Sequence, residues 1–218
     1  TTDPRLREAL LDAMAGGATA GHALAGLAGR TADLAWRQLA AVDAAGGSAA
    51  YSGVRALRQA ADVYAPGAAA AGNLLAAPDV PAAMLAAFQD AAGQSLGDRL
   101  IAAVRAGLAA GGEVTPVRSA GLLIADSVPW PVTDLRVDWH DDPVPELARL
   151  WQLWQPQAGS YVQRALRPAE VTPLCAPPPG RPAAGCWPGE RLPAGRPGPV
   201  DARPGIRRQP GHRRGGYR

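Results

Sequence analysis

The densest group of side chains that could do chemistry lies at one predicted turn: Asp138, His140, Asp141 and Asp142. Carboxylate oxygens beside an imidazole suit a hard or borderline divalent ion. The same residue types at a strand-to-helix turn also cap the helix and bond the local backbone. Because Pro143 follows at once and suits the first turn of a helix, we expect a capped turn and predict no metal and no cofactor.

The pair Gly72-Asn73 is the strongest chemical candidate in the sequence. A glycine permits close approach of the backbone to a substrate, and an asparagine amide can donate a hydrogen bond to an oxyanion. Both residues are equally suited to a turn or a helix cap, so this alternative stays open. We predict Gly72 and Asn73 as oxyanion-stabilising residues.

Arg118-Ser119 precedes an apolar run of strand length and could bind the carboxylate of a substrate. A solvated strand end is the alternative. Thr1 or Thr2 could act as an N-terminal nucleophile, which requires a free α-amine beside the hydroxyl at the start of a buried strand. Asp3-Pro4 instead opens a helix directly, so we do not expect a nucleophile at Thr1.

Apolar periodicity predicts a mixture of helices and strands around these residues. Helices are expected from Pro4, Thr19, Asp79, Ser95 and Pro143, and Ser95 with Asp98 forms an acidic variant of the capping box. Strands are expected at residues 36–42, 48–52, 119–125 and 135–139, with a turn at residues 43–47 between the first two and with Trp139 on the buried face of the last. Residues 53–72 show no clear periodicity of apolar residues, and the run 68–71 fits a helix or a buried strand equally well. A separate short element is expected at residues 159–166.

The composition changes at Pro168. Residues 1–167 carry 13 Arg against 16 acidic residues, whereas residues 168–218 carry 9 Arg against 3 and hold 12 of the 22 prolines. A segment so poor in aliphatic residues cannot offset its ordering entropy. We therefore predict a folded domain at 1–167 and a disordered Pro/Arg/Gly-rich tail at 168–218, which is either native or a frameshift product. The Arg-Gly end resembles nucleic-acid-binding segments, but we do not expect nucleic acid as a partner.

Cysteine usage and hydropathy indicate the cellular compartment in which the protein is expected. Both cysteines lie in the tail, so residues 1–167 have no disulfide or thiolate site. No apolar run approaches the ~20 residues of a membrane span, so no membrane association is expected. Cytoplasm is the default expectation.

Five blocks in order resemble one family. They are Arg37-Gln38-Leu39 with Val42-Asp43, Tyr51-Ser52-Gly53, Gly72-Asn73-Leu74-Leu75, Ser119 to Leu123, and Leu135 to Leu150 with its Asp138-x-His140-x-Asp142-Pro143 core. Their order and spacing resemble the bacterial domain of unknown function ten-twenty-eight, a branch of the N-terminal-nucleophile (Ntn) hydrolase superfamily. The resemblance covers roughly residues 3–167.

The resemblance implies an α+β fold, a four-layer α/β/β/α sandwich that here lacks its first strands. Family members would begin some 45 residues earlier, with a Met-Thr-Phe-Ser-like strand whose Thr is the nucleophile. The implied function is hydrolysis of a small amide or peptide bond, with this chain inactive as a fragment. The alternative is a non-catalytic binding or assembly module on the same fold. The partners expected are a small amide or peptide substrate and a second copy of the chain in a homo-oligomer.

Overall fold

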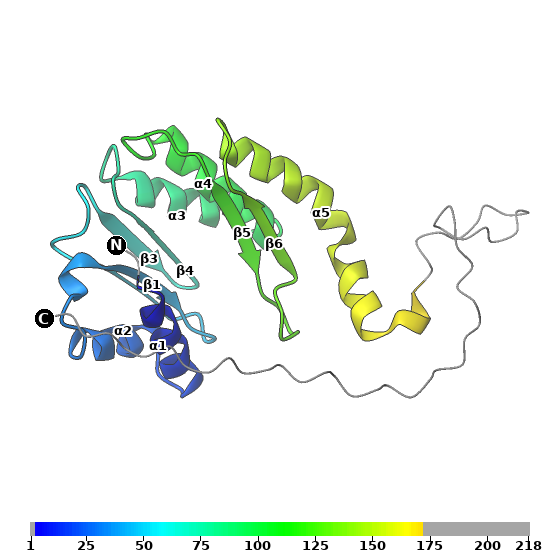
Figure 1. Ribbon diagram of the computed structural model, residues 1–218, viewed down its shortest axis with the longest axis horizontal. Helices are drawn as coiled ribbons and strands as arrows, with labels where there is room; N and C mark the ends of the chain where they lie inside the picture. Colours follow the sequence, from blue (N-terminus) through cyan, green and yellow to red (C-terminus); the bar gives the residue numbers. More distant parts are fainter. Residues whose placement is uncertain (1–2, 172–218) are drawn as a thin grey trace, which may run out of the picture. The chain divides into compact units, whose positions relative to one another are not determined.

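The computed structural model describes residues 3–171 (Figure 1). Residues 172–218 lie outside the described residues, and with them most of the predicted disordered tail. Residues 3–171 form five α-helices and three antiparallel hairpins, so the predicted α+β class is confirmed. None of these helices combines the length and apolar character that crossing a bilayer requires.

The first two helices and the first hairpin form one packing unit. It contains α1 (Pro4–Ala15), α2 (Ala20–Ala28), β1 (Gln38–Val42) and β2 (Ser48–Ser52). Asp3 caps α1 by accepting a hydrogen bond from the Arg5 N–H, as the sequence predicts. Leucines of both helices form a core that packs against the hairpin: Leu6, Leu10, Leu24 and Leu27.

The Asp43 carboxylate fixes the β1–β2 turn to the start of α2. It accepts hydrogen bonds from the backbone N–H groups of Ala20 (2.8 Å), Ala45 (3.0 Å) and Gly47 (2.8 Å). These bonds, led by the one from Ala20, hold the pKa of the Asp43 carboxyl below its ordinary value. The turn predicted at residues 43–47 is confirmed, and it also determines where α2 begins.

The second hairpin lies in the region that gave no clear period. It joins β3 (Ala61–Ala65) to β4 (Ala68–Gly72) through a turn at Pro66-Gly67, where Gly67 has φ of 77°. The run 68–71 is therefore a strand. Alanine carries little hydrophobic signal and favours helices, which is why periodicity did not detect either strand.

Two helices follow the second hairpin, and the first of them covers it. They are α3 (Val80–Asp90) and α4 (Leu96–Ala109). Ser95 caps α4 as predicted, because its hydroxyl accepts from the Asp98 N–H. The reciprocal half of the capping box differs, because the Asp98 carboxylate accepts from the Ser95 hydroxyl and not from the Ser95 N–H. Asp79, by contrast, makes no side-chain cap at α3.

The third hairpin and the last helix complete the fold. They are β5 (Ala120–Ile124), β6 (Thr133–Val137) and α5 (Pro143–Leu166). The prediction that Trp139 lies on a buried strand face is wrong, because β6 ends at Val137 and Trp139 is 78% exposed. The separate element expected at residues 159–166 is also wrong, because α5 continues through Pro156 to Leu166.

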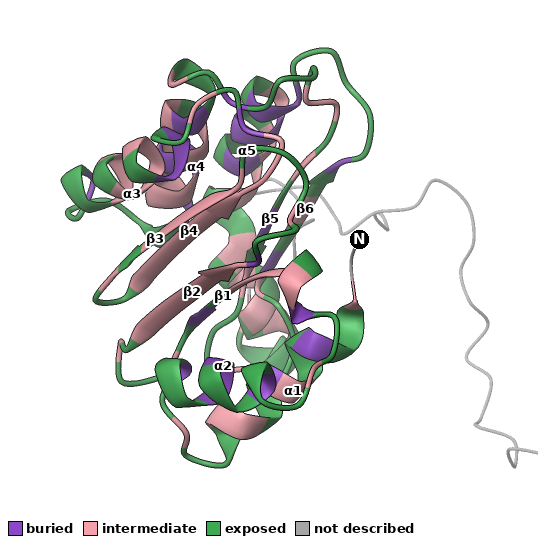
Figure 2. Ribbon diagram, turned by 90° about the vertical axis from the view of Figure 1, so that its left-hand side faces the viewer, coloured by how far each residue is buried: buried purple, intermediate pink, exposed green. Residues whose placement is uncertain are grey.

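The helices and hairpins stack in a fixed order (Figure 2). Helices α1 and α2 pack on the β1–β2 hairpin, this hairpin packs on β3–β4, and α3 covers the far face of β3–β4. Helix α5 packs on β5–β6 and contacts α4, and its core includes Ile101, Leu122, Val137, Leu147 and Trp151. Two 3-10 turns, η1 (Leu34–Trp36) and η2 (Pro168–Glu170), precede β1 and follow α5.

Asp98 joins α4 to α5 and makes the stability of that contact dependent on pH. Hydrogen bonds from the Ser95 hydroxyl and then from the Trp151 indole (2.8 Å) hold the pKa of the Asp98 carboxyl below its ordinary 3.8. A lowered pKa in the folded state adds stability above the unfolded pKa, and this stability is lost as the pH falls through the folded value.

We therefore expect Asp98→Asn to lower the free energy of unfolding at neutral pH, and the difference from the parent chain to shrink as the pH falls below 3.8. Urea unfolding at several pH values, followed by circular dichroism, measures this. Asp12→Asn, at an exposed carboxyl on α1, is the control. A difference that persists at low pH would mean that the charge on Asp98 is not what stabilises the contact.

Candidate functional site

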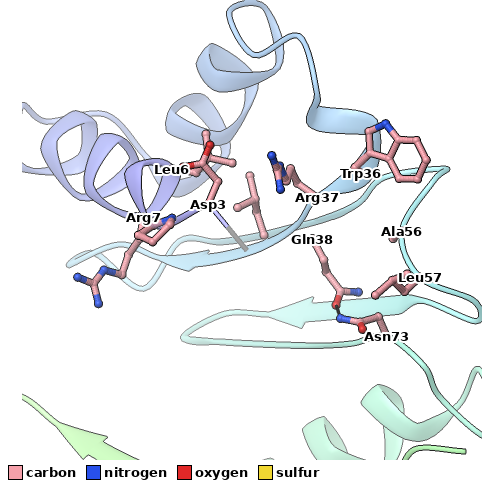
Figure 3. A pocket seen from close by; sticks show the side chains of 11 residues that line it. Asp3, Leu6, Arg7, Trp36, Arg37, Gln38, Ala56, Leu57 and Asn73 are labelled. Carbon is pink, nitrogen blue, oxygen red and sulfur yellow. Dashed lines mark hydrogen bonds between the residues drawn. The ribbon is translucent and has the colours of Figure 1, made fainter. Parts of the chain in front are cut away.

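A cleft of about 610 Å³ lies where α1 begins, where η1 leads into β1, and where β4 ends (Figure 3). Apolar atoms of Leu6, Leu39 and Leu57 line part of it. Charged and amide side chains line the rest: Asp3, Arg7, Arg37, Gln38 and Asn73. Mixed apolar and polar walls of this kind are typical of small-molecule sites.

Gln38, the first residue of β1, connects the ends of two hairpins. Its Nε2 donates to the Ser52 hydroxyl (2.7 Å) on β2, to the Gly72 carbonyl (2.8 Å) on β4 and to the Ala61 carbonyl (3.2 Å) on β3. Each partner is an oxygen acceptor, so the carboxamide has one orientation in which its NH₂ group faces all three. Its Oε1 consequently points the other way, toward Asn73 in the wall of the cleft.

Asn73 follows β4 directly and lies in the wall of the cleft. Its Nδ2 donates to Gln38 Oε1 at 3.3 Å, and Figure 3 shows the two carboxamides adjoining each other. An asparagine amide carries two N–H groups. One is used on Gln38, which leaves the second to donate to a ligand in the cleft. The predicted candidate Asn73 is thus placed and oriented by a chain of side-chain hydrogen bonds.

Gly72 lies next to Asn73 but has a different role in the structure. Its carbonyl accepts from Gln38, and a Cβ built on it would lie 2.7 Å from Cδ2 of Leu75. The glycine therefore provides close packing against Leu75, and it does not line the cleft. It lines a second cavity, of about 260 Å³, together with Ser119.

Arg118 and Ser119 are not among the residues that line the Asn73 cleft. The Arg118 guanidinium pairs with the Asp141 carboxylate and lies 5.9 Å from the centre of the Trp139 ring. The Arg118 carbonyl accepts from the His140 N–H at 2.9 Å. Arg118 therefore joins the start of β5 to the turn before α5, away from Asn73.

The acidic turn is held by local hydrogen bonds. Asp142 occupies the cap position of α5 but makes no side-chain cap. His140 takes part instead, because its Nδ1 accepts from the Asp142 N–H at 2.9 Å. Asp138 pairs with Arg136 at 2.8 Å. Across residues 3–171 no group of three His, Cys, Asp or Glu side chains is placed to hold a metal ion.

Electrostatics at the rim of the cleft centre on Asp3. The bidentate Arg5 guanidinium (2.9 and 2.7 Å) lowers the pKa of the Asp3 carboxyl to about 2, so this carboxylate is ionised throughout the neutral range. Arg7 and Arg37 supply positive charge to the same cleft. A ligand bound here meets both signs of charge around a central pair of carboxamides.

Sequence reasoning singled out Asn73 but not Gln38. The signal that could have identified Gln38 is a lone amide at the start of an otherwise apolar strand, a position where an inward polar side chain needs partners. Those partners come from residues 14 to 35 positions away in the chain, so no local pattern shows them.

The comparisons with known proteins agree on one family. The model of the family of unknown function DUF1028 matches residues 1–147. The crystal structure of protein SPO2555 from Silicibacter pomeroyi, also described by that family model, is similar to 76% of this chain and 72% of its own, with 30% sequence identity and a TM-score of 0.65. No curated protein matches. The chain belongs to the DUF1028 family.

Proposed function

We propose that the cleft around Asn73 binds a small amide or peptide, and that the protein carrying this fold hydrolyses it as an Ntn-type amidohydrolase. One observation carries the proposal: the Asn73 carboxamide lies in the wall of this cleft and is held there by its hydrogen bond to Gln38. The order of helices and hairpins also agrees with the α/β/β/α sandwich of that superfamily. The nucleophile belongs to a Thr on a strand outside the present 218 residues.

The proposed reaction is acyl transfer in two steps. The Thr hydroxyl forms a bond to the amide carbon, its proton passes through the free α-amine to the leaving nitrogen, and the C–N bond breaks. Water then releases the acyl group. Asn73 Nδ2 donates to the oxygen that becomes negatively charged, which is where a fixed donor accelerates the reaction most. Gly72 acts through its carbonyl, which orients Gln38 and through it Asn73.

Asn73→Ala tests this role. In a preparation that hydrolyses small amides or dipeptides, we expect kcat to fall about 100-fold with KM little changed, because an oxyanion donor acts on the transition state. Release of primary amine measures the rate. Gln89→Ala, which removes an exposed amide on α3, is the matched control. An Asn73→Ala variant with unchanged kcat would remove Asn73 from the mechanism.

A second candidate function is a binding module that performs no chemistry. The observation that favours it is that the cleft walls contain no Ser, Thr, Cys or His side chain within the part of the chain that is described. One experiment distinguishes the two candidate functions. With the upstream Thr in place, Thr→Ala should abolish amide hydrolysis if the protein is an enzyme, whereas a binding module shows no turnover before or after the change.

A further inference from the structure

The cleft around Asn73 is apolar at one end. Trp36, Ala56 and Leu57 line this end, and Figure 3 shows them on the opposite side of the pocket from Asp3. Trp36 is 48% exposed and Leu57 is 52% exposed, although both side chains are large and apolar. A ligand that covers these two surfaces removes them from water, which favours binding. We call Trp36 and Leu57 the apolar wall.

Backbone hydrogen bonds hold Leu57 on both sides. On one side, the Arg55 N–H donates to the Ala35 carbonyl at 2.7 Å, within the 3-10 turn η1 that ends at Trp36. On the other side, the Leu57 carbonyl accepts from the Leu74 N–H at 3.2 Å, on the segment that follows β4. Leu57 is therefore tied both to the turn that carries the other half of the apolar wall and to the segment that carries the cleft amide.

Backbone strain is concentrated at this end of the cleft. Two residues other than glycine have positive φ within residues 3–171: Arg58 at 45° and Leu74 at 56°. Each directly follows a residue that lines the cleft, Leu57 in the first case and Asn73 in the second. Left-handed backbone in residues with side chains persists only where the surrounding contacts impose it, and such residues cluster at ligand clamps. The fold therefore specifies the separation between the apolar wall and the Asn73 amide.

Positive charge lies against the apolar wall. The Arg55 guanidinium is 5.5 Å from the centre of the Trp36 ring, a distance typical of a cation–π contact. Arg55 is not among the residues that line the cleft, so it holds the ring from outside. Arg37, which follows Trp36 in the chain, lines the cleft itself. The charge held beside the ring is positive, which disfavours a cationic ligand group at the wall.

The size and polarity of the cleft define its ligand. A volume of about 610 Å³ gives room for a molecule of dipeptide size. The Asn73 carboxamide offers hydrogen bonds to an amide group, and the apolar wall adjoins it through the bond between Leu57 and Leu74. A ligand that satisfies both features carries an uncharged apolar group close to an amide.

We propose that the cleft takes amides and peptides with a large, uncharged apolar side chain next to the bound amide, and that Trp36 and Leu57 bind this side chain and determine the specificity. The inference rests on the proposed function, since it names the substrate class for the same cleft.

Ligand titration tests this specificity on the 218-residue chain. The isotope-labelled protein is titrated separately with N-acetyl-phenylalaninamide, N-acetyl-alaninamide and N-acetyl-lysinamide, and NMR follows the Asn73 side-chain amide and the Trp36 indole N–H. We expect the phenylalanine amide to bind about 10-fold more tightly than the alanine amide, because burial of an aromatic side chain contributes at least this factor. The lysine amide should bind no more tightly than the alanine amide.

Substitutions in the apolar wall locate the preference. Trp36→Ala should reduce the preference for the phenylalanine amide to about two-fold, and Leu57→Ala to about three-fold, because each removes part of the apolar surface. Either variant is sufficient, so the test stands if one of them fails to fold. The matched control is Val54→Ala, because Val54 is 94% exposed on the same loop but does not line the cleft. This variant should keep the full preference.

The inference is overturned if the parent chain binds the phenylalanine and alanine amides equally, or binds the lysine amide more tightly than the phenylalanine amide. An unchanged preference in every folded wall variant would overturn it as well. So would an equal loss of preference in Val54→Ala, because the loss would then not come from the cleft.

The proposed function is tested separately by Asn73→Ala, which should keep the preference because Asn73 acts on the transition state. An unchanged kcat in Asn73→Ala together with an intact preference would contradict the proposed function alone. A reduced kcat in Asn73→Ala together with no preference in the parent chain would contradict the apolar wall alone.

Discussion

Replacing Trp151 by alanine is expected to lower the free energy of unfolding by about 3–5 kcal/mol, the range for removing a buried aromatic side chain. Trp151 is 6% exposed and lies at the centre of the core that joins α4, α5 and the β5–β6 hairpin. Its indole N–H also donates to Asp98, so the substitution removes packing and one of the hydrogen bonds that the Asp98 carboxylate accepts.

The chain contains a matched control for this prediction. Trp139→Ala removes the same side chain from a site that is 78% exposed, and surface substitutions of this kind change stability by about 0.5 kcal/mol or less. Urea unfolding of both variants, followed by tryptophan fluorescence and circular dichroism, gives the comparison. Equal losses from the two variants would contradict the packing described for α5.

Gly53→Ala is expected to destabilise the chain by about 3 kcal/mol, because overpacking against an immovable neighbour forces the backbone to shift. A Cβ on Gly53 would lie 2.3 Å from the Ala35 carbonyl oxygen and 2.7 Å from that of Leu34. These are backbone atoms of η1, which leads directly into Arg37 and Gln38. The Gly53 N–H also donates to the Arg37 carbonyl at 2.8 Å, so the displacement would reach the wall of the Asn73 cleft.

The control is Gly26→Ala on α2, where nothing lies within 4 Å of the added Cβ. Alanine is favoured over glycine in a helix interior by about 0.5–1 kcal/mol, so this variant should be slightly more stable than the parent. Thermal unfolding of the two variants should therefore shift in opposite directions. A Gly53→Ala chain that unfolds at the parent temperature would show that η1 does not lie against Gly53.

Local signals in the sequence predicted much of the fold. The caps formed by Asp3 at α1 and Ser95 at α4 were readable because each capping side chain and the backbone N–H that donates to it lie within a few residues of each other. The turn at residues 43–47 was readable for the same reason. Strand β4 was not, because a run of alanines fits either secondary structure and tertiary packing decides between them.

The candidate site was only partly predictable. Asn73 stood out by residue type, yet its orientation depends on Gln38, 35 positions earlier in the chain. Gly72 and Arg118 also stood out by type. The structure places Gly72 against Leu75 and Arg118 beside Asp141, contacts that require the folded arrangement of three hairpins. Residue type thus singled out Asn73, and only the long-range contacts showed how its amide is held in the wall of the cleft.

The bonds of the Asp43 carboxylate couple events that sequence order would keep apart. One side chain accepts from the first turn of α2 and from the β1–β2 turn, more than 20 residues later. If either element opens alone, the Asp43 carboxylate loses part of its hydrogen bonds while it stays bonded to the other element. Opening one element alone is therefore unfavourable in free energy. Helix α2 and the first hairpin should consequently behave as a single cooperative unit of local unfolding.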